Sequence, residues 1–198
     1  DFGELEQLAK AYREGFVYAG NYSRYRHRRH GSPSRDIQPA RFIAFAQNHD
    51  QVGNRLLGER LSRLTSLAGL KVAAAAVILG PFTPLLFMGE EYGETAPFYY
   101  FVSHGDTELI EAVRQGRAQE FAAFGWDAEP LDPQAEITFQ NSRLQAALRR
   151  QETHQALWQY YQELLNIRRE MLAKVKLGDY FPQVTGLSQQ GVLMLHYG

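Results

Sequence analysis

The densest group of residues that could perform chemistry is Asn48-His49-Asp50, which directly follows the apolar run 41–46. That run is rich in Phe and Ile and predicts a buried parallel strand, with the three polar side chains at its carboxyl end. A carboxylate placed there can stabilise the positive charge that develops when a glycosidic bond breaks, and a histidine can donate to a sugar hydroxyl. Taken alone, the three residues favour a plainer interpretation, in which Asp50 caps a helix and His49 is an ordinary loop residue.

A second apolar run, residues 83–88, also predicts a buried strand, and the polar segment 89–93 follows it. Between the two strands, residues 61–79 predict a helix that Gly80 and Pro81 terminate. A strand, a helix and a strand, with polar residues after each strand, are typical of a parallel sheet covered by helices. In barrels built this way, active-site residues collect at the carboxyl ends of the strands.

The flanking segments extend this α/β pattern. Apolar residues at helical spacing predict a helix from Leu5 to Tyr12 that stops at Gly15, and Thr153 is expected to cap a long helix to Met171. Other predicted elements are a polar loop at 24–39, a helix at 107–124 and, from 173 onward, short strands of an antiparallel layer. A complete eight-stranded barrel needs about 250 residues, whereas these 198 residues contain two barrel-type strands. We therefore expect the chain to be part of a longer protein.

Composition narrows the classes of partner. The net charge of −1 gives no basic surface for nucleic acid or for an anionic membrane, so the basic run 26–30 is interpreted as a solvated or substrate-facing loop. The apolar run 72–87 is too short and too interrupted to span a bilayer. There is no cysteine, and the N-terminal residues do not resemble a signal peptide, which together favour the cytoplasm. The six scattered histidines predict no metal site.

The longer segment 45–55, Phe-Ala-Gln-Asn-His-Asp-Gln-Val-Gly-Asn-Arg, resembles the fourth conserved segment of the α-amylase superfamily, glycoside hydrolase family 13. Within that superfamily it is most similar to the maltooligosyltrehalose trehalohydrolases. Further segments resemble that family in the same order along the chain: 15–23, 30–31, 86–91, 97–101 and 116–121. The resemblance therefore covers nearly the whole chain.

The resemblance implies roles for individual residues. Asp50 corresponds to the aspartate that stabilises the transition state, and His49 to the histidine that binds hydroxyls of the reacting sugar. The same segment implies a pocket-shaping, substrate-binding role for its other polar residues, Gln47, Asn48, Gln51, Asn54 and Arg55. The family's nucleophile and general acid are expected to lie before Asp1, so we expect this chain alone to be catalytically inert.

The expected fold class is α/β: residues 1–172 form the C-terminal part of a (β/α)8 TIM barrel, and residues 173–198 begin an antiparallel C-terminal β domain. The resemblance implies that the parent enzyme hydrolyses the α-1,4 bond beside the terminal trehalose unit of maltooligosyltrehalose, with no cofactor. The alternatives are another amylase-type hydrolase, a branching transglycosidase, or a non-catalytic carbohydrate-binding fragment. Because two strands alone leave open edges, we expect the chain to dimerise, to bind the missing N-terminal part, or to belong to a larger chain.

Several other residues keep two interpretations. Glu90 and Glu91 either face the site or, as is favoured for one of them, pair with an arginine. His104 and Asp106 either contact substrate or form a capped turn, and Arg117 with Glu120 is expected to be a helix-surface pair. Five aromatic residues either stack on glucose rings or pack in the protein: Tyr22, Tyr25, Tyr99, Tyr100 and Trp126.

Overall fold

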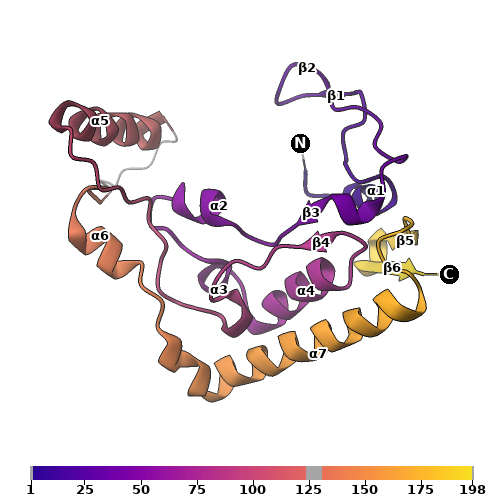
Figure 1. The fold of residues 1–198 in the computed structure, drawn as a ribbon. Helices are drawn as coiled ribbons and strands as arrows, with labels where there is room; N and C mark the ends of the chain where they lie inside the picture. The colour runs from indigo at the N-terminus through magenta and orange to yellow at the C-terminus, as the bar shows by residue number, and fades with distance from the viewer. Residues whose placement is uncertain (1, 124–130, 198) are drawn as a thin grey trace. The chain divides into compact units, whose positions relative to one another are not determined.

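The structure is a computed structural model that describes residues 2–123 and 131–197 as a mixed α/β fold (Figure 1). The helices are α1 Leu5–Glu14, α2 His49–Gly53, α3 Leu61–Leu64, α4 Leu67–Ile78, α5 Thr107–Ala123, α6 Glu136–Asn141 and α7 Glu152–Lys174. The strands are β1 Asn21–Ser23, β2 Arg28–His30, β3 Ile43–Ala44, β4 Thr83–Pro84, β5 Gln183–Leu187 and β6 Val192–His196. Short 3₁₀ helices are η1 Pro39–Arg41, η2 Glu90–Tyr92, η3 Ala146–Arg150 and η4 Ser188–Gln190. Within the described residues, none of the helices is both long and apolar enough to cross a membrane.

Strands β3 and β4 pair in parallel, as the sequence predicts for a βαβ unit (Figure 1). The Thr83 N–H donates to the Phe42 carbonyl and the Leu85 N–H donates to the Ala44 carbonyl, each over 2.9 Å. The strands are shorter than the predicted runs 41–46 and 83–88, since the paired residues are Ile43 with Thr83 and Ala44 with Pro84. Ile43 is 62% exposed, so the prediction that this strand is buried is wrong for the chain by itself.

The described residues divide into two compact units, and α4 and α7 each contribute to both. The first unit comprises residues 2–44, 75–85 and 163–197. Its core is aromatic, because the Phe82 ring lies 5.8 Å from Tyr12, 5.9 Å from Phe42 and 6.4 Å from Phe181. The Tyr12 hydroxyl donates to the carbonyl of Ala76, which fixes α1 against the end of α4.

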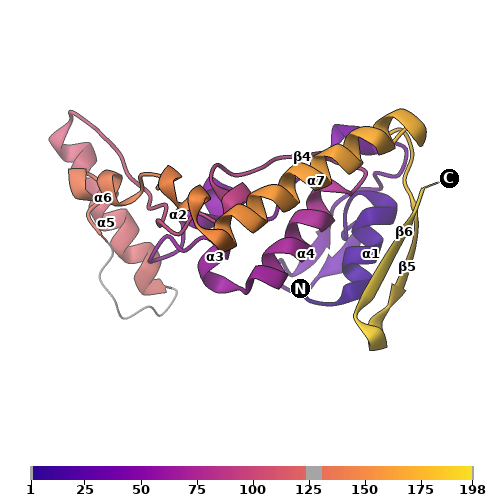
Figure 2. The ribbon, with the colours of Figure 1, turned by 90° about the horizontal axis from the view of Figure 1, so that it is seen from below.

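The antiparallel hairpin β5–β6 belongs to the same unit and lies beside α1 (Figure 2). Gly186 of β5 lies against α1, where a Cβ at this glycine would come within 3.0 Å of the Glu6 carboxylate and 3.6 Å of Ala9. The Arg13 guanidinium donates to the Val184 carbonyl over 3.3 Å. The prediction of antiparallel strands in this region is confirmed, although residues 175–180 contain only the isolated bridge between Leu177 and Tyr180.

The second unit comprises residues 45–74, 86–123 and 131–162. Its core includes Phe87, Tyr92, Leu157 and Tyr161, all at most 7% exposed. The buried Arg60 guanidinium lies 4.7 Å from the Phe87 ring centre and donates to the carbonyls of Met88 and Ala96 over 2.8 Å.

The predicted helix 61–79 is two helices. Thr65 breaks it by adopting an extended backbone, with φ of −141° and ψ of 168°. The Ser66 hydroxyl then accepts the Gly69 N–H over 3.2 Å and starts α4. At Gly69 a Cβ would meet the Thr65 hydroxyl at 2.2 Å, so this glycine gives room for the break.

Other element boundaries also differ from the sequence predictions. Strand β2 forms inside the predicted loop 24–39 and pairs with β1. Helix α7 already includes Glu152, so Thr153 is not its cap, and the helix continues to Lys174. Helix α1 ends at Gly15 as predicted, with φ of 89° at that glycine. The predicted boundary between residues 172 and 173 stays a prediction.

Arg168 of α7 holds the turn that joins α4 to β4. Its guanidinium donates to the carbonyls of Ile78, Gly80 and Phe82 over 2.7, 2.8 and 2.7 Å. Burial lowers the pKa of Arg168, although the group stays charged at any ordinary pH. One side chain therefore satisfies three carbonyls around the end of α4, which would otherwise lack partners.

We expect Arg168→Ala to destabilise the protein by about 2–4 kcal/mol, because three carbonyls lose a charged donor. Arg168→Lys should have a stability between those of the wild type and Arg168→Ala, since an ammonium group does not reproduce the planar fork of the guanidinium. The measurement is urea unfolding followed by circular dichroism. The control is Arg169→Ala, which removes an exposed arginine one position along α7. Equal effects of the Arg168→Ala and Arg169→Ala substitutions on the unfolding free energy would contradict the stabilising role of the three Arg168 hydrogen bonds.

Candidate functional site

The residues Asn48, His49 and Asp50 form the start of the short helix α2 in the second unit. The Asn48 side-chain oxygen accepts the Gln51 N–H over 2.8 Å, so Asn48 is the cap and the alternative in which Asp50 caps the helix is wrong. His49 Nε2 lies 3.4 Å from Asp50 Oδ1, and their side chains are 71% and 73% exposed. Both side chains are therefore open to a ligand in this chain, and Gln51 is exposed as well.

Gln47 differs from the rest of its segment because it is buried, with 6% exposure. Its side-chain oxygen accepts the Leu61 N–H over 2.9 Å, and its Nε2 donates to Glu90 Oε2 over 3.4 Å. The Tyr161 hydroxyl donates to the other Glu90 oxygen over 3.3 Å. Gln47 therefore fixes the backbone before α2, and both its side-chain oxygen and its Nε2 have partners inside the protein.

Burial raises the pKa of Glu90 from 4.5 to about 7, against the opposing effect of hydrogen bonds from the Phe87 backbone and from the Gln47 and Tyr161 side chains. The neighbouring Glu91 raises the pKa further by charge repulsion. The interpretation that Glu90 pairs with an arginine is not what the structure shows, since its side-chain partners are an amide and a phenol. Sequence reasoning missed this group because 71 residues separate Glu90 from Tyr161 and no local pattern joins them.

The far end of α2 is fixed by Arg117 of α5. The guanidinium donates to the Asn54 side chain over 2.8 Å and to the Gly53 carbonyl over 3.1 Å, and it lies 4.8 Å from the Tyr100 ring centre. The predicted pair with Glu120 is present at 2.8 Å, but Arg117 also ties two elements together. Arg55 pairs with Glu59 over 3.2 Å.

The other candidates are placed as follows. The Asp106 carboxylate accepts the N–H groups of Glu108 and Leu109, which makes it the cap of α5, and the His104 backbone pairs with Gln134. Tyr25 is 81% exposed and Tyr22 58% exposed, while Tyr99 is partly buried. Trp126 lies outside the described residues.

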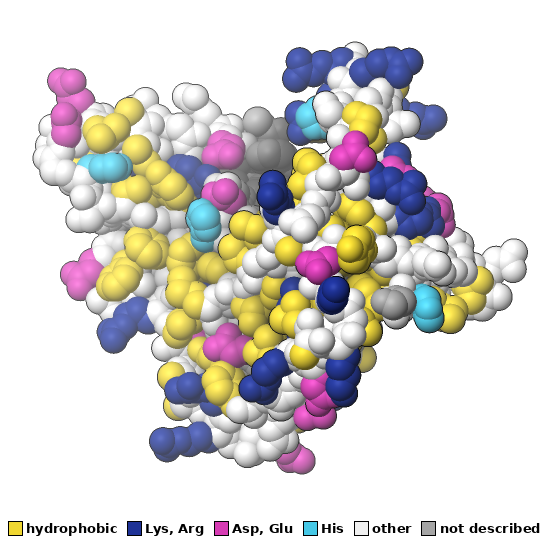
Figure 3. All heavy atoms as spheres, turned by 45° about the vertical axis from the view of Figure 1, so that its right-hand side comes forward, with side chains coloured by type: hydrophobic (Ala, Val, Ile, Leu, Met, Phe, Trp, Pro, Cys, Tyr) yellow, Lys and Arg dark blue, Asp and Glu magenta, His cyan; other side chains and the backbone are white. Residues whose placement is uncertain are grey.

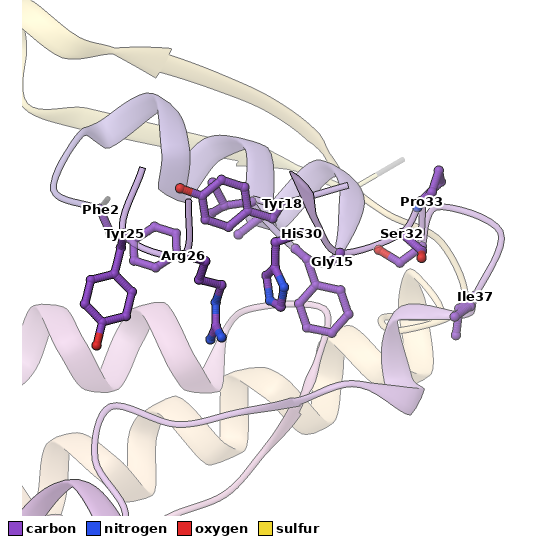
Figure 4. Close-up of a pocket in the computed structure, with 14 residues that line it drawn as sticks. Phe2, Gly15, Tyr18, Tyr25, Arg26, His30, Ser32, Pro33 and Ile37 are labelled. Atoms are coloured by element: carbon purple, nitrogen blue, oxygen red, sulfur yellow. The ribbon is translucent and has the colours of Figure 1, made fainter. Parts of the chain in front are cut away.

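An aromatic hollow of about 750 Å³ lies in the first unit, where Figure 4 shows Tyr18, Tyr25, Arg26 and His30 among its walls. The Tyr18 ring lies 6.0 Å from His30 and 5.6 Å from the Phe2 ring. Gly31, with φ of 78°, allows the loop to approach Tyr18, because a Cβ there would lie 2.1 Å from the Tyr18 carbonyl oxygen. Aromatic rings beside polar groups suit a sugar ring. The segment 15–23, which resembles the family, contributes Gly15, Phe16, Val17 and Tyr18 to the lining, although no pocket was predicted there from the sequence.

The β1–β2 hairpin next to the hollow is strongly basic, and Figure 3 shows dark blue side chains gathered on it. Its exposed arginines are Arg24, Arg26, Arg28 and Arg29. Among residues 2–123 and 131–197, no group of three or more His, Asp or Glu has the arrangement of a metal site. The expectation of no metal and no cofactor stays a prediction.

The fold resembles that of a solved structure. A crystal structure described as "Putative alpha Amylase" from Salmonella typhimurium superimposes with a TM-score of 0.82 at 40% identity, over 91% of this chain and 31% of that one. No protein-family model matches the chain. The chain is therefore part of an α-amylase-type fold, which confirms the predicted fold class.

Comparison with curated proteins gives the family. Malto-oligosyltrehalose trehalohydrolases from Arthrobacter ramosus, Rhizobium sp. and Saccharolobus solfataricus are 46%, 43% and 40% identical over 173, 181 and 192 residues. These matches cover 86%, 90% and 94% of this chain. The chain belongs to the malto-oligosyltrehalose trehalohydrolase family, and it spans about 30% of the length of these relatives.

We expect Asn48→Ala to destabilise the start of α2 by about 1 kcal/mol, because the Gln51 N–H loses its acceptor. Hydrogen exchange at the Gln51 amide should be about fivefold faster. Asn48→Asp should keep the cap and most of the protection. Gln51→Ala is the matched control, since it leaves the backbone donor and its acceptor in place. Unchanged exchange in Asn48→Ala would contradict the capping role.

Glu90 should make stability depend on pH. The folded pKa of about 7 exceeds the ordinary value of 4.5, so the folded state binds a proton more tightly than the unfolded chain. Its contribution is fully present below about pH 4.5 and is lost as the pH rises to about 7, a change on the order of 2–3 kcal/mol. The difference in unfolding free energy between wild type and Glu90→Gln should therefore fall across this range. A difference that does not change with pH would argue against assigning the pH dependence to Glu90. An equal fall in the difference between wild type and Glu91→Gln would do the same.

Proposed function

We propose that this chain is one section of an enzyme that hydrolyses the α-1,4 bond beside the terminal trehalose unit of maltooligosyltrehalose and releases trehalose. The observation that carries the proposal is the identity of 40–46% to malto-oligosyltrehalose trehalohydrolases over a chain that includes Asn48-His49-Asp50. The exposed carboxylate and imidazole of that segment support it, because both are free to meet a sugar.

Asp50 is proposed to stabilise the oxocarbenium-like transition state, and His49 to bind hydroxyls of the sugar at the bond that is cleaved. The capped α2 segment supplies a fixed backbone for both side chains. The Asn48 side chain accepts the Gln51 N–H, and the buried Gln47 side chain accepts the Leu61 N–H. Arg55, which follows α2, forms an ion pair with Glu59. These residues are proposed to shape the substrate pocket rather than to transfer protons.

A retaining glycosidase also needs a nucleophile and a general acid about 5–5.5 Å apart. We do not assign either role to a residue of this chain, and we propose that both carboxylates come from a section that these 198 residues do not include. On this proposal the chain alone is inert, and it acts when joined to that section or when bound to it.

The proposed partner is a maltooligosaccharide-type substrate, and the proposed location is the cytoplasm, without nucleic-acid or membrane binding. Ile43 and Leu85 lie at the parallel strand pair and are 62% and 39% exposed. The missing section of the enzyme is proposed to cover them, and a homodimer is the alternative. The aromatic hollow of the first unit favours a second candidate function, carbohydrate binding without turnover.

The test is a chimera in which this chain replaces the matching segment of the Arthrobacter ramosus relative. We expect it to release trehalose from maltooligosyltrehalose, and Asp50→Asn to lower kcat by at least about 100-fold, because a preorganised charge is lost from the transition state. Asp179→Asn, an exposed aspartate of the first unit, is the control and should leave kcat unchanged.

A folded chimera that binds the oligosaccharide but never cleaves it would support carbohydrate binding over hydrolysis. Cleavage that survives Asp50→Asn would contradict the role of Asp50. Trehalose release by the 198-residue chain alone would contradict the proposal that the other two carboxylates lie elsewhere.

A further inference from the structure

Three buried side chains connect the start of the candidate site to helix α7. Gln47 precedes α2, Glu90 lies in η2 and Tyr161 lies in α7, and they are 6%, 6% and 5% exposed. The Gln47 amide donates to one Glu90 oxygen and the Tyr161 hydroxyl to the other. Both carboxylate oxygens therefore have a donor, which is the arrangement that an ionised carboxylate prefers.

The orientation of the Gln47 amide is fixed at both ends. Its oxygen accepts the Leu61 N–H over 2.9 Å, so its NH₂ group must point toward Glu90. The next residue, Asn48, uses its own side chain to accept the Gln51 N–H. Two consecutive amides thus hold the backbone on either side of Asp50, one from the interior of the unit and one along α2.

The charged and titratable groups that act on Glu90 are few. Glu91 is its neighbour in η2, Tyr161 comes from α7, and Arg60 precedes α3. The Arg60 guanidinium donates to the carbonyls of Met88 and Ala96 and attracts Glu90 only from a distance. Burial thus raises the pKa of Glu90 to about 7, so its charge changes near neutral pH.

Protonation changes what Glu90 offers to its donors. A neutral carboxyl group carries a hydrogen on one oxygen, and that oxygen becomes a weaker acceptor. Since Gln47 and Tyr161 each donate to one oxygen, one of these contacts must weaken or rearrange. The two contacts are of nearly equal length, 3.4 Å from Gln47 and 3.3 Å from Tyr161, so protonation of Glu90 acts on both.

We propose that Glu90 is a positioning residue for Asp50: its carboxylate holds the Gln47 side chain, and this hold sets the backbone that carries Asp50. The inference rests on the proposed role of Asp50 in glycoside cleavage. It adds a function for a buried acid that does not itself meet the substrate.

The test is ¹⁵N NMR of the 198-residue chain between pH 5.5 and 9, in a His49→Ala background that removes the neighbouring imidazole. We expect the side-chain NH₂ signals of Gln47 and the backbone amide of Asp50 to shift together, with one midpoint near pH 7. Glu90→Gln should abolish both shifts. Tyr161→Phe keeps the ring and removes one donor to the carboxylate, so it should move the midpoint to higher pH.

Glu91→Gln is the matched control, and the shifts should persist in it with a lower midpoint, because a repelling charge is removed. Shifts that survive Glu90→Gln would overturn the assignment. A Gln47 titration without any response at Asp50 would overturn the positioning role. None of these readouts needs substrate, so failure of the chimera to hydrolyse maltooligosyltrehalose would count against the proposed function and leave this result intact.

Discussion

The turn between α4 and β4 depends on the Arg168 guanidinium, which binds three carbonyl groups within five residues of chain. A helix end leaves carbonyls without partners, and burying them costs free energy unless a donor is supplied. Because Arg168 supplies these donors from α7, the chain can leave α4 after Ile78 and enter β4 at Thr83. The Thr83 N–H then donates to the Phe42 carbonyl, which places the start of β4 beside the start of β3.

After β3 ends, polar side chains rather than a neighbouring strand accept the backbone N–H groups. Gln47 faces inward and satisfies the Leu61 N–H, while Asn48 satisfies the Gln51 N–H. The residues with proposed chemical roles, His49 and Asp50, follow these two amides and point to solvent. A short helix of five residues is marginal by itself, so the buried amide and the Arg117 contacts at its other end are what make it a fixed platform.

The sequence was most informative where a local pattern decides the structure. Alternation of apolar runs and polar segments predicted the parallel pair, and Gly15 predicted the end of α1. The break at Thr65 was missed because the residues on both sides favour a helix, and only the cap at Ser66 interrupts it. The exposed Ile43 was missed for a different reason: an apolar run indicates that a strand prefers burial, not that its covering neighbours belong to the same chain. The hydrogen bonds of Glu90 join Gln47 and Tyr161, which are distant in the sequence, so no local pattern predicts them.

Helix α7 carries Tyr161 and Arg168 seven residues apart, which places them on the same side of a regular helix. Each side chain has a fixed target, a carboxylate for one and a set of carbonyls for the other. Inserting or deleting one residue between them would rotate one side chain by about 100° about the helix axis relative to the other. A change in the length of this stretch would therefore alter which side of α7 each residue faces, whereas a substitution on its exposed face would not.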